Sequence, residues 1–101
     1  MPMLNPSHPG ALLREDIVPA LKADKCIVGI TDLAQRLGYS RPHFSNILHE
    51  RAPITAELAY RLELAGLGVA RNWLAMQSAY DLAQVAQGQQ PHIVRLVPEA
   101  A

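Results

Sequence analysis

The stretch TDLAQRLGYSRPHFSNILHER, residues 31–51, decides the fold of this 101-residue chain. Apolar residues recur at helical spacing on both sides of the tripeptide Gly38-Tyr39-Ser40. The spacing predicts two short helices, over residues 30–37 and 41–49, with Gly38 ending the first and Ser40 capping the second. Two short helices joined by a glycine-containing turn are typical of a helix-turn-helix.

The second helix of this pair has two distinct faces. Its expected core stripe consists of Phe44, Ile47 and Leu48. A polar face without any acidic residue consists of Pro42, Ser45, Asn46 and His49, with Arg41 at its leading end. The second helix of a helix-turn-helix enters the major groove of DNA N-terminus first, so its early residues meet base edges. We therefore expect Arg41 to read a guanine and Asn46 an adenine, each by two hydrogen bonds.

Other residues of the stretch suit contacts with the DNA backbone, which position a protein without reading sequence. They are Ser40, His43, Ser45, His49 and the basic Arg51. The local charge supports DNA binding only modestly, because Arg36, Arg41 and Arg51 outnumber the two acidic residues of the stretch by one. A plain helical hairpin with a solvated polar face is the alternative interpretation.

The rest of the chain also follows a helical period. Ser7 or His8 is expected to cap a first helix beginning at Pro9, which Pro19 ends or bends. A helix over 56–65, capped by Thr55, is expected to bury Leu58, Leu62 and Ala65, and a last helix over 70–87 stops at Gly88. The predicted fold is all-α, a five-helix repressor-like bundle. It comprises a helix-turn-helix domain over 1–88 and a tail over 89–101, where 92–97 form a possible short strand.

Composition narrows the classes of protein. The 9 Lys and Arg balance 9 Asp and Glu, and half of the residues are hydrophobic, which argues against a disordered chain or a strongly basic coat protein. The lone Cys26 excludes an intrachain disulfide and is expected to be a small buried residue. We find no signal peptide and no apolar run near the roughly 20 residues of a membrane helix, so we expect a cytoplasmic location.

An ordered set of short motifs carries a family resemblance. The set is His8-Pro9-Gly10, Leu13-Arg14-Glu15, Thr31-Asp32-Leu33-Ala34, Leu37-Gly38, Ser40-Arg41, Ser45, Ile47-Leu48, Ile54-Thr55, Ala59, Arg61-Leu62, Trp73-Leu74, Gln77 and Tyr80-Asp81-Leu82. With this spacing the chain resembles the HigA-like antitoxins of the Xre/phage-repressor superfamily. The resemblance implies a homodimer that binds operator DNA, represses its own operon and inhibits a co-encoded HigB-like toxin, an mRNA endonuclease. It also implies base contacts by Arg41, Pro42 and Asn46.

Four positions depart from the pattern of that family. Ile30 stands where a phosphate-contacting glutamine is frequent, and Pro42 where a polar base-reading residue is usual. His49-Glu50 replaces a common Asn-Gly pair, and Gly66-Leu67 replaces an aromatic residue followed by glycine. The first three departures bear on DNA affinity more than on the fold.

The last helix is apolar on more than one side, which a small protein covers by self-association. Trp73 is expected in the core. The expected dimer interface consists of Leu82, Val85, Ile93, Val94 and Leu96.

Other classes of function remain as alternatives. The four histidines show no metal-ligand spacing, and we find no phosphate loop or nucleophile motif, so we expect no enzyme, no metal and no cofactor. A stand-alone Xre-type repressor without a toxin partner is one alternative. A protein-binding module of this fold without DNA binding is the other.

Overall fold

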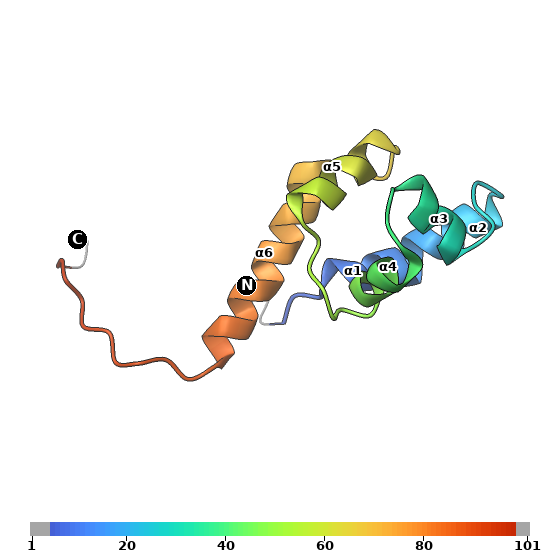
Figure 1. The fold of residues 1–101 in the computed structure, drawn as a ribbon. Coiled ribbons are helices and arrows are strands. Elements are labelled where there is room, and N and C mark those ends of the chain that lie inside the picture. The colour runs from blue at the N-terminus through green and yellow to red at the C-terminus, as the bar shows by residue number, and fades with distance from the viewer. Residues whose placement is uncertain (1–4, 99–101) are drawn as a thin grey trace.

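The computed structural model describes residues 5–98, which form five helices and no strand (Figure 1). The first helix runs from residue 9 to residue 23 as α1 (Pro9–Leu12), a π-helical turn η1 (Leu13–Ile17) and α2 (Val18–Ala23). The others are α3 (Ile30–Arg36), α4 (Arg41–Leu48), α5 (Ala56–Leu64) and α6 (Ala70–Gln87). The predicted all-α class is confirmed. The first four and last three residues of the expected domain and tail lie outside the described residues.

The first helix begins as expected and continues past Pro19, so of the two alternatives for Pro19 the end of the helix is wrong. The Nδ1 atom of His8 accepts a hydrogen bond from the Gly10 N–H at 2.9 Å and caps the helix. Pro19 does not end the helix; instead the hydrogen-bond pattern changes before it, where the Val18 N–H reaches back five residues to the Leu13 carbonyl. Pro19 then lies in the first turn of α2, where a residue without an N–H is tolerated.

The core is formed by the buried side of each helix. It contains the expected Phe44, Ile47 and Leu48 stripe of α4 together with Leu13, Leu33, Leu37, Ile54, Leu58, Leu62 and Trp73. The indole N–H of Trp73 donates to the Leu67 carbonyl at 2.7 Å, which satisfies its one polar atom.

Two expectations about burial are wrong. Ala65 is exposed, because α5 ends at Leu64 and the chain then turns away through Gly66; Ala59 occupies the core instead. Cys26 is exposed, because it lies in the turn after α2 and the next residue, Ile27, takes the buried position.

The C-terminal part gives the molecule an elongated shape. Residues 89–98 leave the end of α6 and run away from the helices without regular structure (Figure 1). The expected strand over 92–97 does not form in the single chain, because a strand needs a neighbouring strand for its hydrogen bonds. The radius of gyration is 16.9 Å, against about 13 Å for a compact 100-residue domain.

Within residues 5–98, no helix is long and apolar enough to cross a membrane.

Candidate nucleic-acid interface

The turn between α3 and α4 forms as the sequence predicts. Gly38 adopts a left-handed conformation with φ of 77°, which lets the chain reverse directly after α3. The hydroxyl of Ser40 then accepts a hydrogen bond from the His43 N–H at 3.2 Å and caps α4. Pro42 lies in the first turn of α4, where its missing N–H costs nothing.

A residue of α5 holds this turn in place. The guanidinium of Arg61 donates to the Leu37 carbonyl at 2.8 Å and to the Gly38 carbonyl at 3.4 Å. It also lies 5.1 Å from the centre of the Tyr39 ring and pairs with Glu57 at 3.3 Å. The cation thereby satisfies the carbonyls at the end of α3 and fixes the orientation of α4 relative to α5.

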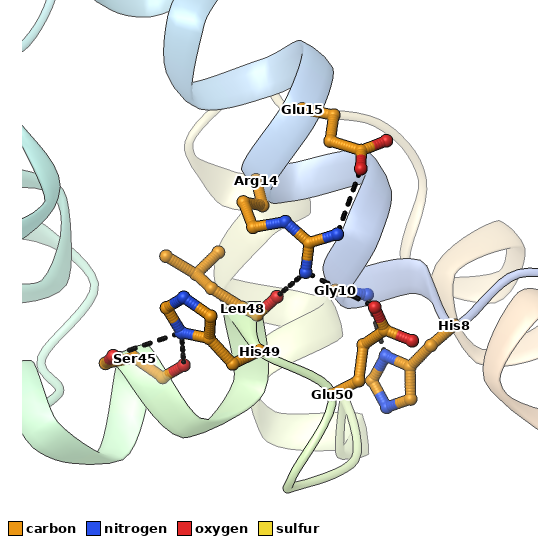
Figure 2. Close-up of polar contacts among 8 residues, drawn as sticks. All are labelled: His8, Gly10, Arg14, Glu15, Ser45, Leu48, His49 and Glu50. Carbon is orange, nitrogen blue, oxygen red and sulfur yellow. Dashed lines mark hydrogen bonds and ion pairs between the residues drawn. The ribbon is translucent and has the colours of Figure 1, made fainter.

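The other end of α4 is held from the first helix, as Figure 2 shows. Arg14 donates to the Leu48 carbonyl at 2.7 Å and contacts the Glu50 carboxylate at 3.2 Å. Its second terminal nitrogen lies 3.0 Å from Glu15. The hydrogen bond to Glu15, and to a smaller extent the one to Glu50, raises the pKa of Arg14 above its usual value. A cation at this position also suits the negative end of the helix dipole.

The predicted base-contacting residues are all exposed on the outer side of α4. Arg41 is at the first position of the helix, and Pro42 and Asn46 lie one turn apart. Among the predicted backbone contacts, Ser40, His43, His49 and Arg51 are exposed and Ser45 is half-buried.

Several of these side chains bind one another. The Asn46 side-chain oxygen accepts a hydrogen bond from Nε of Arg51 at 3.1 Å. The ring of His49 folds back onto α4, with Nδ1 2.9 Å from the Ser45 carbonyl and 3.3 Å from its hydroxyl (Figure 2). The ring of His43 packs edge-on against Tyr39, with 5.1 Å between the ring centres. The outer face of α4 is therefore linked by contacts among its own side chains.

The charges around this face separate into paired and unpaired groups. Asp32 pairs with Arg36 at 3.0 Å, as Glu50 does with Arg14 and Glu57 with Arg61. A hydrogen bond from the Val28 N–H and the ion pair with Arg36 lower the pKa of Asp32. Within residues 5–98, neither Arg41 nor Arg51 has a carboxylate partner. A chain of zero net charge thus presents unpaired cations beside α4.

Two of the positions that depart from the family pattern, Ile30 and Glu50, have local explanations. Ile30 is half-buried at the start of α3 and packs against the core, so its side chain is not available to a phosphate. Glu50 has a positive φ of 65°, the conformation that glycine favours, and its carboxylate is paired with Arg14.

The residues of the predicted dimer interface lie on α6 and the tail. Leu82 and Val85 are 68% and 57% exposed on the second half of α6. The tail residues Ile93, Val94 and Leu96 are exposed as well. In the described part of the chain, no group of three or more His, Cys, Asp or Glu side chains is placed to hold a metal ion.

Known proteins resemble this chain in sequence or in structure. No family model matches the chain. Virulence-associated protein A' of Dichelobacter nodosus is 35% identical over 86 residues, which cover 84% of this chain and 70% of that protein. The solved structure of antitoxin GraA is 34% identical, with a TM-score of 0.68 over 82% of this chain and 84% of the other. Antitoxin HigA of Pseudomonas aeruginosa, solved with the higBA promoter, is 30% identical, with a TM-score of 0.72 over 82% and 85%.

The chain belongs to the HigA-type antitoxin family. The resemblance drawn from the sequence motifs is thereby confirmed, and so is the repressor-like arrangement of five helices. HigA-type antitoxins are not enzymes, in agreement with the class expected from the sequence. The two arginine contacts that hold α4 were not predicted. Arg14 and Arg61 lie 34 and 24 residues away from the carbonyls that they bind, and no local spacing signals such pairs.

Proposed function

We propose that this chain is a DNA-binding antitoxin that represses its own operon and neutralises a co-encoded HigB-like mRNA endonuclease. The observation that carries the proposal is the outer face of α4. It is polar and free of acidic residues, and it is held at both ends by Arg61 and Arg14. It is flanked by Arg41 and Arg51, neither of which pairs with a carboxylate in the part of the chain that the structure describes. The HigA relative solved with the higBA promoter supports the same use of this fold.

In this proposal α4 enters the major groove with its N-terminus leading. Arg41 donates two hydrogen bonds to a guanine, Asn46 pairs with an adenine, and Pro42 makes van der Waals contact. Contacts with phosphates are assigned to Ser40, His43, Ser45, His49 and Arg51.

The proposed repressor is a homodimer. Residues 1–88 form its helix-turn-helix domain and residues 89–101 its tail, and the interface uses Leu82, Val85, Ile93, Val94 and Leu96. A two-fold dimer brings its two recognition helices to half-sites about 34 Å apart, or a multiple of that distance. Since an operator-binding protein shares a compartment with the DNA, we assign the chain to the bacterial cytoplasm.

Binding to the DNA upstream of its own gene tests the operator proposal. We expect fluorescence anisotropy to show tighter binding to this DNA than to a shuffled duplex of the same composition. The logarithm of the affinity should fall linearly with the logarithm of the salt concentration, because phosphate contacts release counterions. Equal binding to both duplexes, or no binding, would identify a protein-binding module instead.

The neighbouring reading frame tests the toxin proposal. Expression of its product alone should arrest growth, co-expression with this chain should restore growth, and the two proteins should co-purify. A neighbour whose product is harmless and does not bind would leave a stand-alone repressor.

A further inference from the structure

An apolar groove lies between the N-terminal segment and the second half of α6. Its volume is about 940 Å³. One wall consists of Pro6, Pro9 and Leu12, and the other of Ala79, Ala83 and Ala86. The groove is open because these three α6 residues are small, and few polar atoms line it. Exposed apolar surface of this kind marks a binding site in a water-soluble domain.

The tail carries an apolar segment that nothing covers. Ile93, Val94, Leu96 and Val97 are between 65% and 96% exposed. Between residues 89 and 98, the hydrogen bond from Gln90 to the Val85 carbonyl is the contact that ties the tail to the helices. Figure 1 shows that the tail leaves the end of α6 in a direction away from the other helices. The tail residues 89–98 are not among the residues that line the groove of their own chain.

We propose that the tail of one copy of this chain fills the α6 groove of a second copy, and that the exchange is reciprocal. The inference rests on the proposed homodimer and names the segment that completes it. Leu82 lines the groove and is exposed. If two α6 helices pack antiparallel through Leu82, the contact between the helices and the groove form one continuous surface. That pairing sets the end of each α6 beside the middle of its partner.

The dimensions and the chemistry of the two surfaces agree. Residues 92–97 span about 20 Å when extended, and the part of α6 between Ala75 and Gln87 is about 18 Å long. Side chains alternate along an extended segment, so Val94 and Leu96 share a face while Arg95 points the other way. An uncharged aliphatic face of this kind matches a groove of alanine, proline and leucine side chains.

Cross-linking between two differently tagged chains tests the exchange directly. Both chains carry Cys26→Ser; one carries Ala79→Cys in the groove and the other Leu96→Cys in the tail. With a short bis-maleimide we expect a cross-linked heterodimer in the mixture, well above the yield for Glu57→Cys, on α5, paired with Leu96→Cys. A yield no higher than this control would overturn the proposal. So would an intramolecular link in a chain carrying both cysteines, because the tail would then fold onto its own groove.

Sedimentation equilibrium separates this inference from the homodimer itself. Ending the chain after Gly88, or introducing Val94→Asp with Leu96→Asp, should raise the dimer dissociation constant at least tenfold while the helical circular dichroism persists. The matched control, Gln35→Asp with Gln89→Asp, adds the same charge at exposed positions outside the groove and should change the dissociation constant little. A shortened chain that dimerises as tightly as the full chain would overturn the tail exchange and leave the homodimer. A monomeric full chain would overturn both.

Discussion

Asn46 and Arg51 show how the polar face is prepared at the scale of single residues. To pair with adenine, an asparagine amide must present both its oxygen and its nitrogen in one orientation. The hydrogen bond from Arg51 Nε to the Asn46 oxygen, at 3.1 Å, fixes which way the amide points. The oxygen keeps a second lone pair for a base. Arg51 is therefore expected to position Asn46 as well as to meet a phosphate.

A double-mutant cycle on operator binding tests this coupling. Asn46→Ala should cost about 1–3 kcal/mol and relax the preference at one base pair. Arg51→Ala should relax the preference at the same base pair, and the double variant should lose less than the sum of the two. Arg36→Ala, which removes a cation paired with Asp32, is the control. Strict additivity, with an equal loss on every sequence, would reduce Arg51 to a phosphate contact.

Arg41 is the second residue whose chemistry can be isolated. Arg41→Ala should weaken operator binding by about 1–3 kcal/mol and relax preference at one guanine. Arg41→Lys keeps the charge but loses the two-pronged donor geometry, so it should lose the base preference while the salt dependence stays nearly unchanged. Competition anisotropy with single-base operator variants measures both. If neither Arg41→Ala nor Asn46→Ala alters binding, α4 is not the recognition helix.

The protonation of His8, which caps the first helix, makes the stability of the chain depend on pH. Its ring is buried, with Nδ1 accepting the Gly10 N–H and an edge-on contact with Tyr80. Burial lowers its pKa below the usual value of 6.5, and this outweighs the raising effects of Glu50 and Asp81. Because the folded chain then binds a proton less readily than the unfolded chain, the stability from neutral His8 is complete above pH 6.5. It is lost as the pH falls below that value.

Urea unfolding at pH 7.5 and pH 5.5 measures this effect. The unsubstituted chain should lose stability at the lower pH. His8→Asn keeps a capping acceptor and does not titrate, so the part of the loss that is due to His8 should disappear, even if packing against Tyr80 is weaker. An unchanged pH dependence in His8→Asn would assign the effect to other groups.

At the scale of elements, α4 is held from three sides. Arg61 of α5 secures the turn before it, and Arg14 of η1 binds the carbonyl of its last residue, Leu48. In addition, α1 approaches the end of α4 so closely at Gly10 that a Cβ there would overlap the Ile47 carbonyl oxygen. The position of α4 is therefore set by contacts with elements far away in the sequence.

The close approach at Gly10 gives an element-level prediction. Gly10→Ala must push α1 away from α4 and should destabilise the chain by about 1–3 kcal/mol or more, as overpacked cores do. Gly29→Ala is the matched control, because its Cβ would meet no atom within 4 Å. Thermal unfolding by circular dichroism compares them. Equal midpoints for the two variants would mean that α1 and α4 do not require the contact.

The sequence predicts the local features of these elements but not the contacts between them. The helices, the Ser40 and Thr55 caps and the Gly38 turn follow from local patterns, because helical period and capping are local effects. The predicted burial of Cys26 and Ala65 is wrong, because the exposure of these residues depends on where the chain turns after a helix. The contacts of Arg14 and Arg61 were missed, because they join residues that only tertiary packing brings together.

At the scale of the whole molecule, charge balance and DNA binding are compatible. In the described residues 5–98, ion pairs hold the acidic groups around the helix-turn-helix and leave Arg41 and Arg51 without a carboxylate partner. Because only these two unpaired arginines lie beside α4 in that part of the chain, one copy of the helix supplies only a modest electrostatic attraction. Two linked helices compensate, since the second contact then forms at a high effective concentration.

Half-site DNA tests this dependence on the dimer. A duplex with both half-sites should bind roughly 10²–10⁴ times more tightly than one with a single half-site. Shifting one half-site by about five base pairs, half a helical turn, should abolish the gain because the second helix then faces the wrong side. Equal affinity for single and double half-sites would indicate a monomeric binder.

Glu50, with its left-handed backbone, bears on how long the proposed repressor stays on its operator. A residue with a side chain is less stable in that conformation than glycine by roughly 1–2 kcal/mol, and Glu50 also adds a carboxylate at the end of the recognition helix. That carboxylate pairs with Arg14 at 3.2 Å, so the charge of Arg14 is offset and does not attract phosphates at this end of α4. Within the proposed repressor, the lost attraction shortens the residence time on the operator, because affinity differences among related complexes are mainly differences in dissociation rate. A promoter controlled by such a protein would reopen soon after the protein concentration falls.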